Sequence, residues 1–490
     1  MSAHVIAVDV GTSAVRAAVV HAEGHLVASS HIRRVSGLGG ETFDPEVLHR
    51  DVLAALAKLA DCPAPAALAI AAHIGTVAVD AALQPLDLGG GWADTRGMHE
   101  LTAVDDATAQ QVLGSSGRPS LTGGALAYLL GLGKERAARV AAVLSPKDYL
   151  LARLTGRLTT DTIDAAYTLA SDVRRRSWNT AVLERLGLDP ALFPPQAEPV
   201  SVVGELTAGA AAATGLPAGL PVVAGGPDGS VGIGLLLGTS EELIADVAGT
   251  TDVVGRLLPH GIEPPQGAML NPAVLPGRFV AGGASGLTGG AVAHWRSLVG
   301  AVEEEGLAAV PPGAGGLTIV PTMTGARFPR WRPGSRGAVL GQRPEHDAAH
   351  VLRAAHEAAT FTVREGLDLL DPTGRLPVAL AGGSARSAWV AQLRADVLAR
   401  PLLVSPEPDV TLLGAASLAF AGAGEATGPD AIRSRLIGEM REVEPDSSRS
   451  ARYAELYAHW RRLQDAVDEA VVSSAGFGRG RLQQPAVGQL

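Results

Sequence analysis

The sequence has 490 residues, only 4% of them aromatic, with a single cysteine and no long hydrophobic run. Cys62 alone can form neither an internal disulfide nor a thiolate metal cluster, and its place at the end of a helical pattern indicates a small, inert side chain. No stretch reaches the length of about 18 apolar residues that a membrane span needs, and the first residues lack a basic segment. We therefore expect a cytoplasmic protein.

An excess of positive charge is also missing. The formal net charge is −10, and the arginines are scattered along the chain. The densest basic run, Arg174–Arg176, is typical of a solvated turn. An acidic chain offers no electrostatic footprint for nucleic acid or an anionic membrane, so we expect neither as a partner.

The length and composition indicate a globular chain with more than one domain. Apolar residues make up 47% of the sequence and charged residues 18%. A chain of 490 residues exceeds what one hydrophobic core usually supports. The 60 glycines suit tight packing and close approach of the backbone to a ligand, but they also make short glycine motifs frequent by chance.

The first residues alternate strand and helix signals. Apolar runs at Val5–Val8, Val15–Val20 and Leu26–Ser29 predict three antiparallel strands joined by turns. An amphipathic helix over residues 45–61 and a buried strand over Ala66–Ala72 follow. A Rossmann domain would begin with strand, helix, strand, so this order excludes it.

A weak internal repeat divides the chain. Val5–Ser13, which contains Asp-Val-Gly-Thr-Ser, is echoed by Leu243–Thr251, which ends in Gly-Thr-Thr, although Val247 stands where Asp9 would be. We expect one domain over residues 1–242, a second over 243–473, and a disordered tail over 474–490. Long helices are predicted over 347–370 and 449–471.

The repeated turns suit phosphate binding. A turn with one glycine and two hydroxyl residues offers backbone and side-chain donors to an anion, and Asp9 before it can hold Mg²⁺ through water. One such turn is also compatible with an ordinary hairpin. Two of them, one in each half, can hold a polyphosphate from both sides.

Two further segments follow apolar strands. Asp228, in Gly-Gly-Pro-Asp-Gly-Ser, is expected where a strand ends and a helix begins, a place where ligands collect in open sheets. A helix cap is the alternative interpretation of this acid. Gly382-Gly383-Ser384 can lie flat against a nucleobase or phosphate, but the glycine spacing does not fit a dinucleotide fingerprint.

Taken together, an ordered set of motifs resembles the FGGY family of carbohydrate kinases, and within it xylulose kinases, over roughly residues 4–470. The set comprises Asp9–Ser13, Trp92–Arg96, Pro146–Leu150, Thr155-Gly156, Asp161 with Asp164–Ala166, Gly225–Asp228, Gly249–Thr251, Arg327–Pro329 with Arg336-Gly337, Gly382–Ser387, Trp389, Gln392, Asp396 and Leu413–Ala416. No member is specific alone, whereas their order is.

The resemblance implies an α/β fold of two actin-like (ribonuclease H-like) domains around an ATP cleft, with the sugar held mainly by the first domain and the nucleotide by the second. It implies that Asp228 is the catalytic base and that Asp9 supports Mg²⁺ and phosphate, with both carboxylates near the metal. ATP would contact the residues of the three glycine-containing turns: Gly11, Thr12, Ser13, Gly249, Thr250, Thr251, Gly382, Gly383 and Ser384. The substrate would contact His73, Ile74, Gly75, Trp92, Asp94, Arg96 and Gly229.

The resemblance implies a ketopentose substrate such as D-xylulose, but two departures bear on it. Xylulose kinases have a Gln-Met-His-Gly stretch where this chain has Ala72-His73-Ile74-Gly75, and an asparagine after the base where this chain has Gly229. In addition, Pro227 replaces a glycine. A site that loses polar partners discriminates strongly, so weak activity on D-xylulose or a preference for another ketose or polyol is the alternative expectation.

Two other functions share part of this pattern. An actin- or Hsp70-like ATPase would have the same phosphate turns, but it would not need the Asp228 segment or Trp92–Arg96. A kinase-like sugar sensor without turnover would not need both Asp9 and Asp228. We expect ATP and Mg²⁺ as cofactors and a small sugar or polyol as partner. The sequence leaves a homodimer open.

Overall fold

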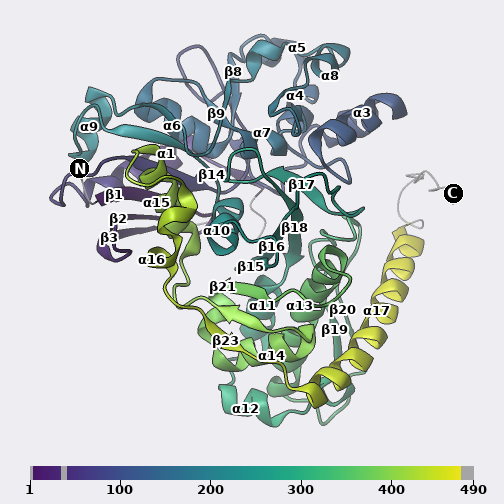
Figure 1. Cartoon of the computed structure of the whole chain (residues 1–490). Coiled ribbons are helices and arrows are strands. Elements are labelled where there is room, and N and C mark those ends of the chain that lie inside the picture. The colour runs from purple at the N-terminus through teal and green to yellow at the C-terminus, as the bar shows by residue number, and fades with distance from the viewer. Residues whose placement is uncertain (1–3, 35–40, 476–490) are drawn as a thin grey trace.

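The structure is a computed structural model that describes residues 4–34 and 41–475. It contains two large mixed sheets, which we call the first sheet and the second sheet (Figure 1). The first sheet consists of β1 (His4–Val10), β2 (Ala14–His21), β3 (Leu26–Arg33), β5 (Leu68–Ala72), β13 (Val202–Glu205) and β14 (Pro221–Pro227). The second sheet consists of β15 (Ile244–Ala248), β16 (Thr251–Leu257), β17 (Met269–Pro272), β18 (Phe279–Leu287), β21 (Val378–Gly382), β22 (Leu402–Val404) and β23 (Arg441–Val443).

Helices and short strands surround the sheets. The helices are α1 (Pro45–Ala57), α2 (Met98–Thr102), α3 (Asp106–Ser116), α4 (Ala125–Leu130), α5 (Lys134–Ala137), α6 (Pro146–Thr155), α7 (Thr162–Tyr167), α8 (Thr180–Arg185), α9 (Ala208–Thr214), α10 (Asp228–Leu237), α11 (Gly289–Val299), α12 (Glu304–Ala309), α13 (Ala348–Leu370), α14 (Ala388–Leu398), α15 (Val410–Gly422), α16 (Arg433–Ile437) and α17 (Ser447–Ala475). The short strands are β4 (Thr42–Phe43), β6 (Val77–Val79), β7 (Gly89–Gly90), β8 (Ala142–Leu144), β9 (Thr160–Asp161), β10 (Ser171–Asp172), β11 (Ser177–Trp178), β12 (Gln196–Ala197), β19 (Thr318–Val320) and β20 (Ala338–Leu340), and 3-10 turns lie at Pro190–Leu192, Ala314–Gly316, Gly383–Arg386 and Pro429–Ile432.

The predicted elements form close to where the sequence patterns indicated, although the helix predicted to reach residue 61 ends at Ala57 and the strand predicted from Ala66 begins at Leu68. Strands β1, β2 and β3 pair antiparallel, and β5 then pairs parallel to β1. Helix α1 begins at Pro45, where a missing N–H costs nothing, and the side chain of Asp44 caps it. Helix α17 runs to Ala475, two residues into the tail predicted to be disordered; the rest of that tail lies outside the described residues.

The two sheets share a strand order, which gives the sequence repeat a structural counterpart. The first sheet runs β13-β14-β5-β1-β2-β3, and the second, taken from its opposite edge, runs β23-β22-β21-β15-β16-β18 with β17 as an additional strand. In each, a hairpin (β1-β2 or β15-β16) is followed by a parallel neighbour, β5 or β21. The two Gly-Thr turns therefore occupy equivalent places in the two sheets.

Helices α10 and α15 are exchanged between the sheets. Helix α10 follows β14 of the first sheet but packs on β15, β16 and β21, whereas α15 follows β22 of the second sheet but packs on β1, β5 and β14. The two helices cross closely, because a Cβ on Gly414 would lie 2.7 Å from the Val231 carbonyl oxygen. One apolar core joins both sheets through these helices, and Figure 1 draws α10 between the two sheets. The predicted domain boundary between residues 242 and 243 stays a prediction.

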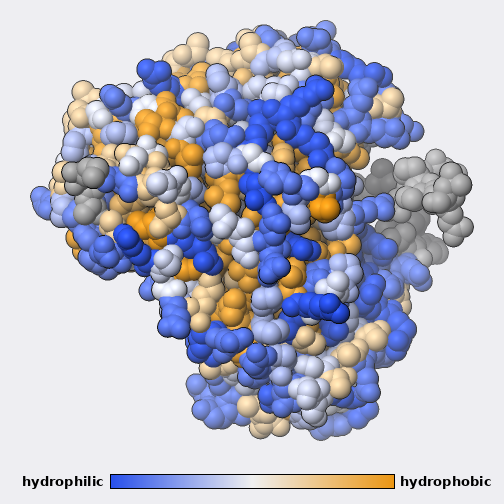
Figure 2. All heavy atoms as spheres, viewed as in Figure 1, coloured by the Kyte–Doolittle hydropathy of each residue, from blue (hydrophilic) through white to orange (hydrophobic). Residues whose placement is uncertain are grey.

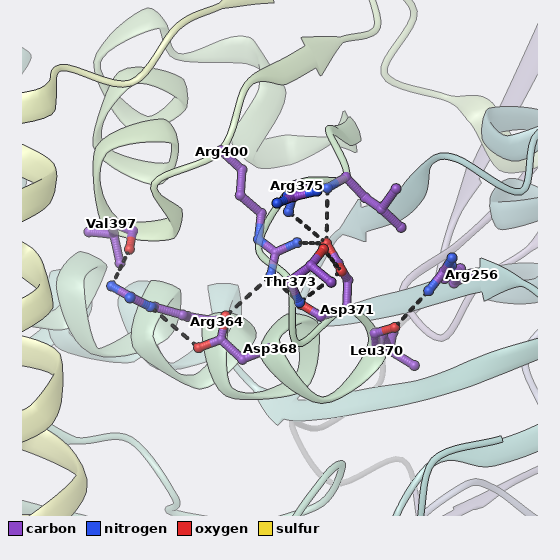
Figure 3. Close-up of polar contacts among 10 residues, drawn as sticks. Arg256, Arg364, Asp368, Leu370, Asp371, Thr373, Arg375, Val397 and Arg400 are labelled. Atoms are coloured by element: carbon purple, nitrogen blue, oxygen red, sulfur yellow. Dashed lines mark hydrogen bonds and ion pairs between the residues drawn. The ribbon is translucent and has the colours of Figure 1, made fainter.

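The end of α13 is fixed by a buried carboxylate. Asp371 accepts hydrogen bonds from the backbone N–H groups of Thr373, Arg375 and Leu376 at 2.9 to 3.1 Å and forms an ion pair with the buried Arg400 at 2.6 Å. Figure 3 shows Thr373, Arg375 and Arg400 around Asp371. Although desolvation opposes it, this set of donors holds the pKa of Asp371 well below its usual range. The turn leads directly into β21.

Hydrophilic residues cover much of the face drawn in Figure 2, and the hydrophobic residues visible there gather mostly in its upper and middle parts. Among residues 4–34 and 41–475, no helix combines the length and the apolar character needed to cross a bilayer.

Candidate active site

The turn between β1 and β2 contains the first predicted phosphate-binding residues, Gly11, Thr12 and Ser13. The backbone N–H of Gly11 donates to the carbonyl of Ala14 at 2.9 Å, which closes the turn. Arg34, which follows β3, makes two hydrogen bonds to this turn. Its backbone N–H donates to the Ser13 carbonyl and its guanidinium donates to the Gly11 carbonyl, each at 2.8 Å. The turn thus presents two hydroxyl residues from a fixed backbone.

Asp9 lies on β1, just before this turn, and its side chain is buried. Its cross-strand neighbour, Arg16 on β2, forms an ion pair with it and a second one with Asp409, which precedes α15. Burial raises the pKa of Asp9 to about 6; Arg16 acts against this shift and the charge of Asp228 adds to it. The carboxylates of Asp9 and Asp228 therefore interact electrostatically, although one lies on β1 and the other begins α10.

Asp228 stands where the sequence predicted, at the junction of β14 and α10. Its Oδ1 accepts a hydrogen bond from the backbone N–H of Gly229 at 2.6 Å. Burial raises the pKa of Asp228, while the Gly229 N–H and the charge of Arg16 lower it. The strand reaches this point through Gly225, whose φ is +69° and whose missing Cβ would lie 1.9 Å from the Ile70 carbonyl oxygen. A carboxylate with one donor and a raised pKa suits proton acceptance.

The second turn and the glycine-rich segment lie side by side. Gly249 and Thr250 connect β15 to β16, which begins at Thr251, and the Thr250 carbonyl accepts from the N–H of Gly290 on α11 at 2.9 Å. Strand β21 pairs with β15 so that Gly382 faces Ala248. A Cβ on Gly382, whose φ is +95°, would lie 2.5 Å from the Ala248 carbonyl oxygen. Gly383 and Ser384 continue directly from this contact.

Behind the second turn lies an ion-pair network that the sequence did not predict. Arg394 on α14 is buried and pairs with Asp246 of β15 and Asp252 of β16, each at 2.6 Å. It also donates to the Ser384 hydroxyl at 3.4 Å. Burial raises the pKa of Asp246, and the neighbouring Asp252 adds to that shift. The network ties both strands of the hairpin to the glycine-rich segment.

The segment predicted to contact the sugar begins at the end of β5. His73 is buried, its ring Nδ1 lies 3.2 Å from the Ile74 carbonyl oxygen, and it packs edge-on against Phe43 at 5.1 Å between ring centroids. Burial lowers the pKa of His73 to about 4, so the ring is neutral near pH 7. Gly75 leaves room for the carbonyl of Gly90, which would lie 2.4 Å from an added Cβ.

Within Trp92–Arg96, two of the predicted substrate contacts pair with each other. Arg96 forms an ion pair with Asp94 at 2.7 Å and stacks on Tyr128, with its Cζ 4.8 Å from the ring centroid. Asp94 also accepts the backbone N–H of Arg96 at 3.0 Å. The Trp92 ring is covered by the guanidinium of Arg327, which comes from the second half of the chain.

One group of acidic side chains in the described part of the chain could share a metal ion: Asp148, Asp161 and Asp164. The ammonium of Lys147 already lies among them, 3.1 Å from Asp161 and 3.5 Å from Asp164, in an ion pair with Asp148. Burial raises the pKa of Asp164 well above its usual value. This fully buried cluster ties α6 to α7 by its internal ion pairs, and Asp9 with Asp228 remain the predicted metal ligands.

Solved structures share this architecture. Gluconate kinase from Lactobacillus acidophilus superimposes with a TM-score of 0.86 over 96% of this chain and 99% of its own, at 21% identity. The fold is thus the two-domain α/β fold of carbohydrate kinases.

Sequence comparison then gives the family. Residues 4–234 match the N-terminal domain of the FGGY family of carbohydrate kinases, and residues 244–423 match its C-terminal domain. This chain belongs to that family and is a sugar kinase. Its relatives include the xylulose kinase of Bacillus subtilis (strain 168), 27% identical over 94% of this chain and 96% of its own. The xylulose kinase of Streptomyces coelicolor (strain ATCC BAA-471 / A3(2) / M145) is 32% identical over 87% of this chain and 89% of its own. Kinases of this family use ATP and Mg²⁺.

Proposed function

We propose that this chain transfers the γ-phosphoryl group of ATP to a hydroxyl of a ketopentose such as D-xylulose, with Asp228 as the base. The observation that carries the proposal is the environment of Asp228: a raised pKa, one hydrogen-bond donor to its side chain among the residues that the structure describes, and a place at the start of the helix that links the two sheets. The xylulose kinases among the relatives support the choice of sugar.

In this mechanism Asp228 accepts the proton of the attacking hydroxyl as the new bond to phosphorus forms, a contribution of about 10²–10⁴-fold. Its partner Gly229 N–H fixes one oxygen, which leaves the other carboxylate oxygen for the substrate. The turns at Gly11–Ser13 and Gly249–Thr251, with Gly382–Ser384, would hold the nucleotide by backbone and hydroxyl donors.

The residues present fit a magnesium ion. Asp9, through water, and Asp228 would offer carboxylate oxygens to this ion, and the charge of Asp228 adds to the effect of burial in raising the pKa of Asp9, so a divalent cation would relieve their repulsion. Mg²⁺ would neutralise phosphate charge when bound. Arg16 holds Asp9 in place through its ion pair.

The alternative substrate is another ketose or polyol. Ile74 and Gly229 favour it, because they offer fewer polar groups than the histidine and the asparagine of the xylulose kinase pattern. An ATPase that only drives partner binding, without a small-molecule substrate, does not fit a carbohydrate kinase family member.

The test is ADP release with MgATP over a matched panel of ketoses, aldoses and polyols, with mass spectrometry of the phosphorylated product. We expect sugar-dependent ADP release with D-xylulose among the accepted sugars. Release that is independent of every sugar would contradict the proposal. A clear preference for D-xylulose would contradict the alternative substrate. His73 would then be the residue that contacts the sugar, one position away from the histidine of the xylulose kinase pattern.

A further inference from the structure

Arg327 brings a residue of the second half of the chain onto the predicted sugar segment. It lies between β19 and β20, and the next residue, Phe328, is buried and donates its backbone N–H to the Ala284 carbonyl of β18 at 3.1 Å. The Cζ of Arg327 lies 4.1 Å from the ring centroid of Trp92. The backbone next to Arg327 is therefore hydrogen-bonded to the second sheet, while the Arg327 guanidinium covers the ring of Trp92 in the first half of the chain.

The hydrogen bonding of Arg327 differs from that of the other stacked arginines. Eight arginines in residues 4–34 and 41–475 lie over aromatic rings, and six of them also pair with a carboxylate: Arg96, Arg153, Arg176, Arg353, Arg364 and Arg461. Arg118 lacks a carboxylate but donates to the carbonyls of Ser116 and Leu270 and to the Asn271 side chain. Within the same described ranges, Arg327 has only one contact with an oxygen, the Trp92 carbonyl at 3.4 Å.

This leaves a largely desolvated cation with unused donors. Burial lowers the pKa of Arg327 to about 10, without a neighbouring carboxylate to oppose the shift, and the group remains charged near pH 7. A guanidinium has five N–H donors in a planar fork, which matches a carboxylate or a phosphate with two parallel hydrogen bonds. The charge and geometry of Arg327 therefore suit an oxyanion.

The position of Arg327 connects the two parts of the predicted reaction. Its Cβ lies 4.0 Å from where a Cβ on Gly286 would be. The next residue along β18, Leu287, pairs with Thr251 of the second phosphate turn. On the opposite side lies Trp92, in the segment predicted to bind the sugar.

We infer that Arg327, stacked on Trp92, forms an oxyanion-binding site between the second phosphate turn and the sugar segment. The inference rests on the proposed function for the identity of its ligand, which is an oxyanion of the acceptor side: the phosphoryl group once transferred, or the carboxylate of an acidic sugar. The stacked tryptophan holds the fork in one plane, and the remaining N–H groups bind the ligand.

The test is equilibrium binding by calorimetry, which requires no turnover. With saturating MgADP, which fills the nucleotide site, inorganic phosphate, D-gluconate and its uncharged counterpart sorbitol are titrated into the wild type, Arg327→Met and Arg327→Lys. We expect Arg327→Met to weaken phosphate or gluconate at least tenfold and to leave sorbitol unchanged. Arg327→Lys should fall between, because it keeps the charge and loses the fork. A loss confined to phosphate identifies the transferred group, whereas a loss for gluconate identifies an acidic sugar.

Two results would overturn the inference. Equal affinities of the wild type and Arg327→Met for both anions would show that no oxyanion binds there. An equal loss for all three ligands, with a fall in melting temperature matching that of Trp92→Phe, would reduce Arg327 to a structural contact. Because no sugar must be phosphorylated, a negative result in the substrate panel leaves this test intact.

Discussion

Asp371 and Asp228 both lie at a helix terminus, but they differ in how many hydrogen-bond donors surround the carboxylate. Asp371 ends α13 and accepts backbone N–H groups, the Thr373 hydroxyl and the Arg400 guanidinium, so its pKa lies below the usual range. Asp228 begins α10 with one short backbone hydrogen bond, and burial raises its pKa. A saturated carboxylate fixes structure, whereas an undersaturated one keeps the capacity to take a proton.

The largest expected effect comes from Asp228→Asn, which keeps the shape of the side chain and removes its ability to accept a proton. Sugar-dependent ADP release should fall by at least about 10²-fold. Stabilisation by MgATP in a thermal shift assay should persist, because the phosphate turns are intact. Turnover above roughly a tenth of the wild type, more than the loss of a general base allows, would place the base elsewhere.

Asp371→Ala should reverse that pattern and affect stability. It leaves the buried Arg400 without its main partner, which should lower the free energy of unfolding in urea by about 3 kcal/mol. The fraction that stays folded should keep its turnover. Asp368→Ala is the matched control, because Asp368 is half-exposed and its ion pairs should be worth less than about 1 kcal/mol. Equal losses in the two variants would contradict the role given to Asp371.

Asp9→Ala should lower turnover by about 10–100-fold and weaken its dependence on Mg²⁺, since the carboxylate is assigned to the ion's outer shell. A Mg²⁺ titration of the initial rate measures both. Asp409→Asn removes the other partner of Arg16 and keeps Asp9, so it should shift the titration less. An unchanged titration in Asp9→Ala would leave this acid as a residue of the turn alone.

As the pH falls, Asp9 and Asp228, whose pKa values are raised, should become protonated before Asp371, whose pKa is lowered. Asp9, with a pKa of about 6, and Asp228, whose pKa is raised, become protonated as the pH falls, so kcat/KM should drop roughly tenfold per pH unit for each group below that region. Their raised values mean that these two groups bind more protons in the folded state than in the unfolded chain, so by themselves they do not weaken folding between pH 7 and 5, whereas the lowered pKa of the buried His73 acts in the opposite direction.

Asp371 affects the pH dependence of folding stability in the opposite direction. Its depressed pKa contributes stability that is present above the ordinary value of 3.8 and is lost as the pH falls below it. We therefore expect activity to disappear at a higher pH than the fold, as measured by initial rates and circular dichroism on the same samples. Coincident transitions would mean that unfolding, not protonation of the site, limits activity.

The smallest expected effect comes from Gly229→Asn, which adds a polar group beside the base. We expect a shift of a few-fold in the ratio of kcat/KM values toward D-xylulose. A Cβ here would lie 3.2 Å from the Cγ atoms of Val253, so Gly229→Ala controls for added volume. The same shift in both variants would assign the effect to packing.

The sequence predicted the parts of the fold that depend on nearby residues. Strand β14 and the start of α10 at Asp228 follow from an apolar run and a Gly-Pro turn, and the two Gly-Thr turns follow from the repeat. Pairings between distant segments left no such signal. Arg16 and Asp409 are 393 positions apart, and nothing in either neighbourhood indicates the other.

Within the candidate site, the same distinction explains what was missed. Arg394 pairs with Asp246 and Asp252, which are about 140 to 150 positions away in the sequence. The sequence indicated only that Asp246 does not align with Asp9 in the repeat. Asp94 and Arg96 were predicted to contact the substrate, and their pairing with each other depends on side-chain geometry that spacing alone does not fix. Their role toward a sugar stays a prediction, as do those of the other candidate residues.

The exchange of α10 and α15 makes the contact between the two halves of this chain resemble a subunit interface inside one polypeptide. Cutting the chain between residues 242 and 243 would leave the first sheet without the helix that covers β1, β5 and β14, and would leave α10 attached to the wrong half. Each fragment would expose the apolar surface that now forms the shared core. The two fragments should be insoluble alone and should recover a fold only when produced together, as partners that complement each other.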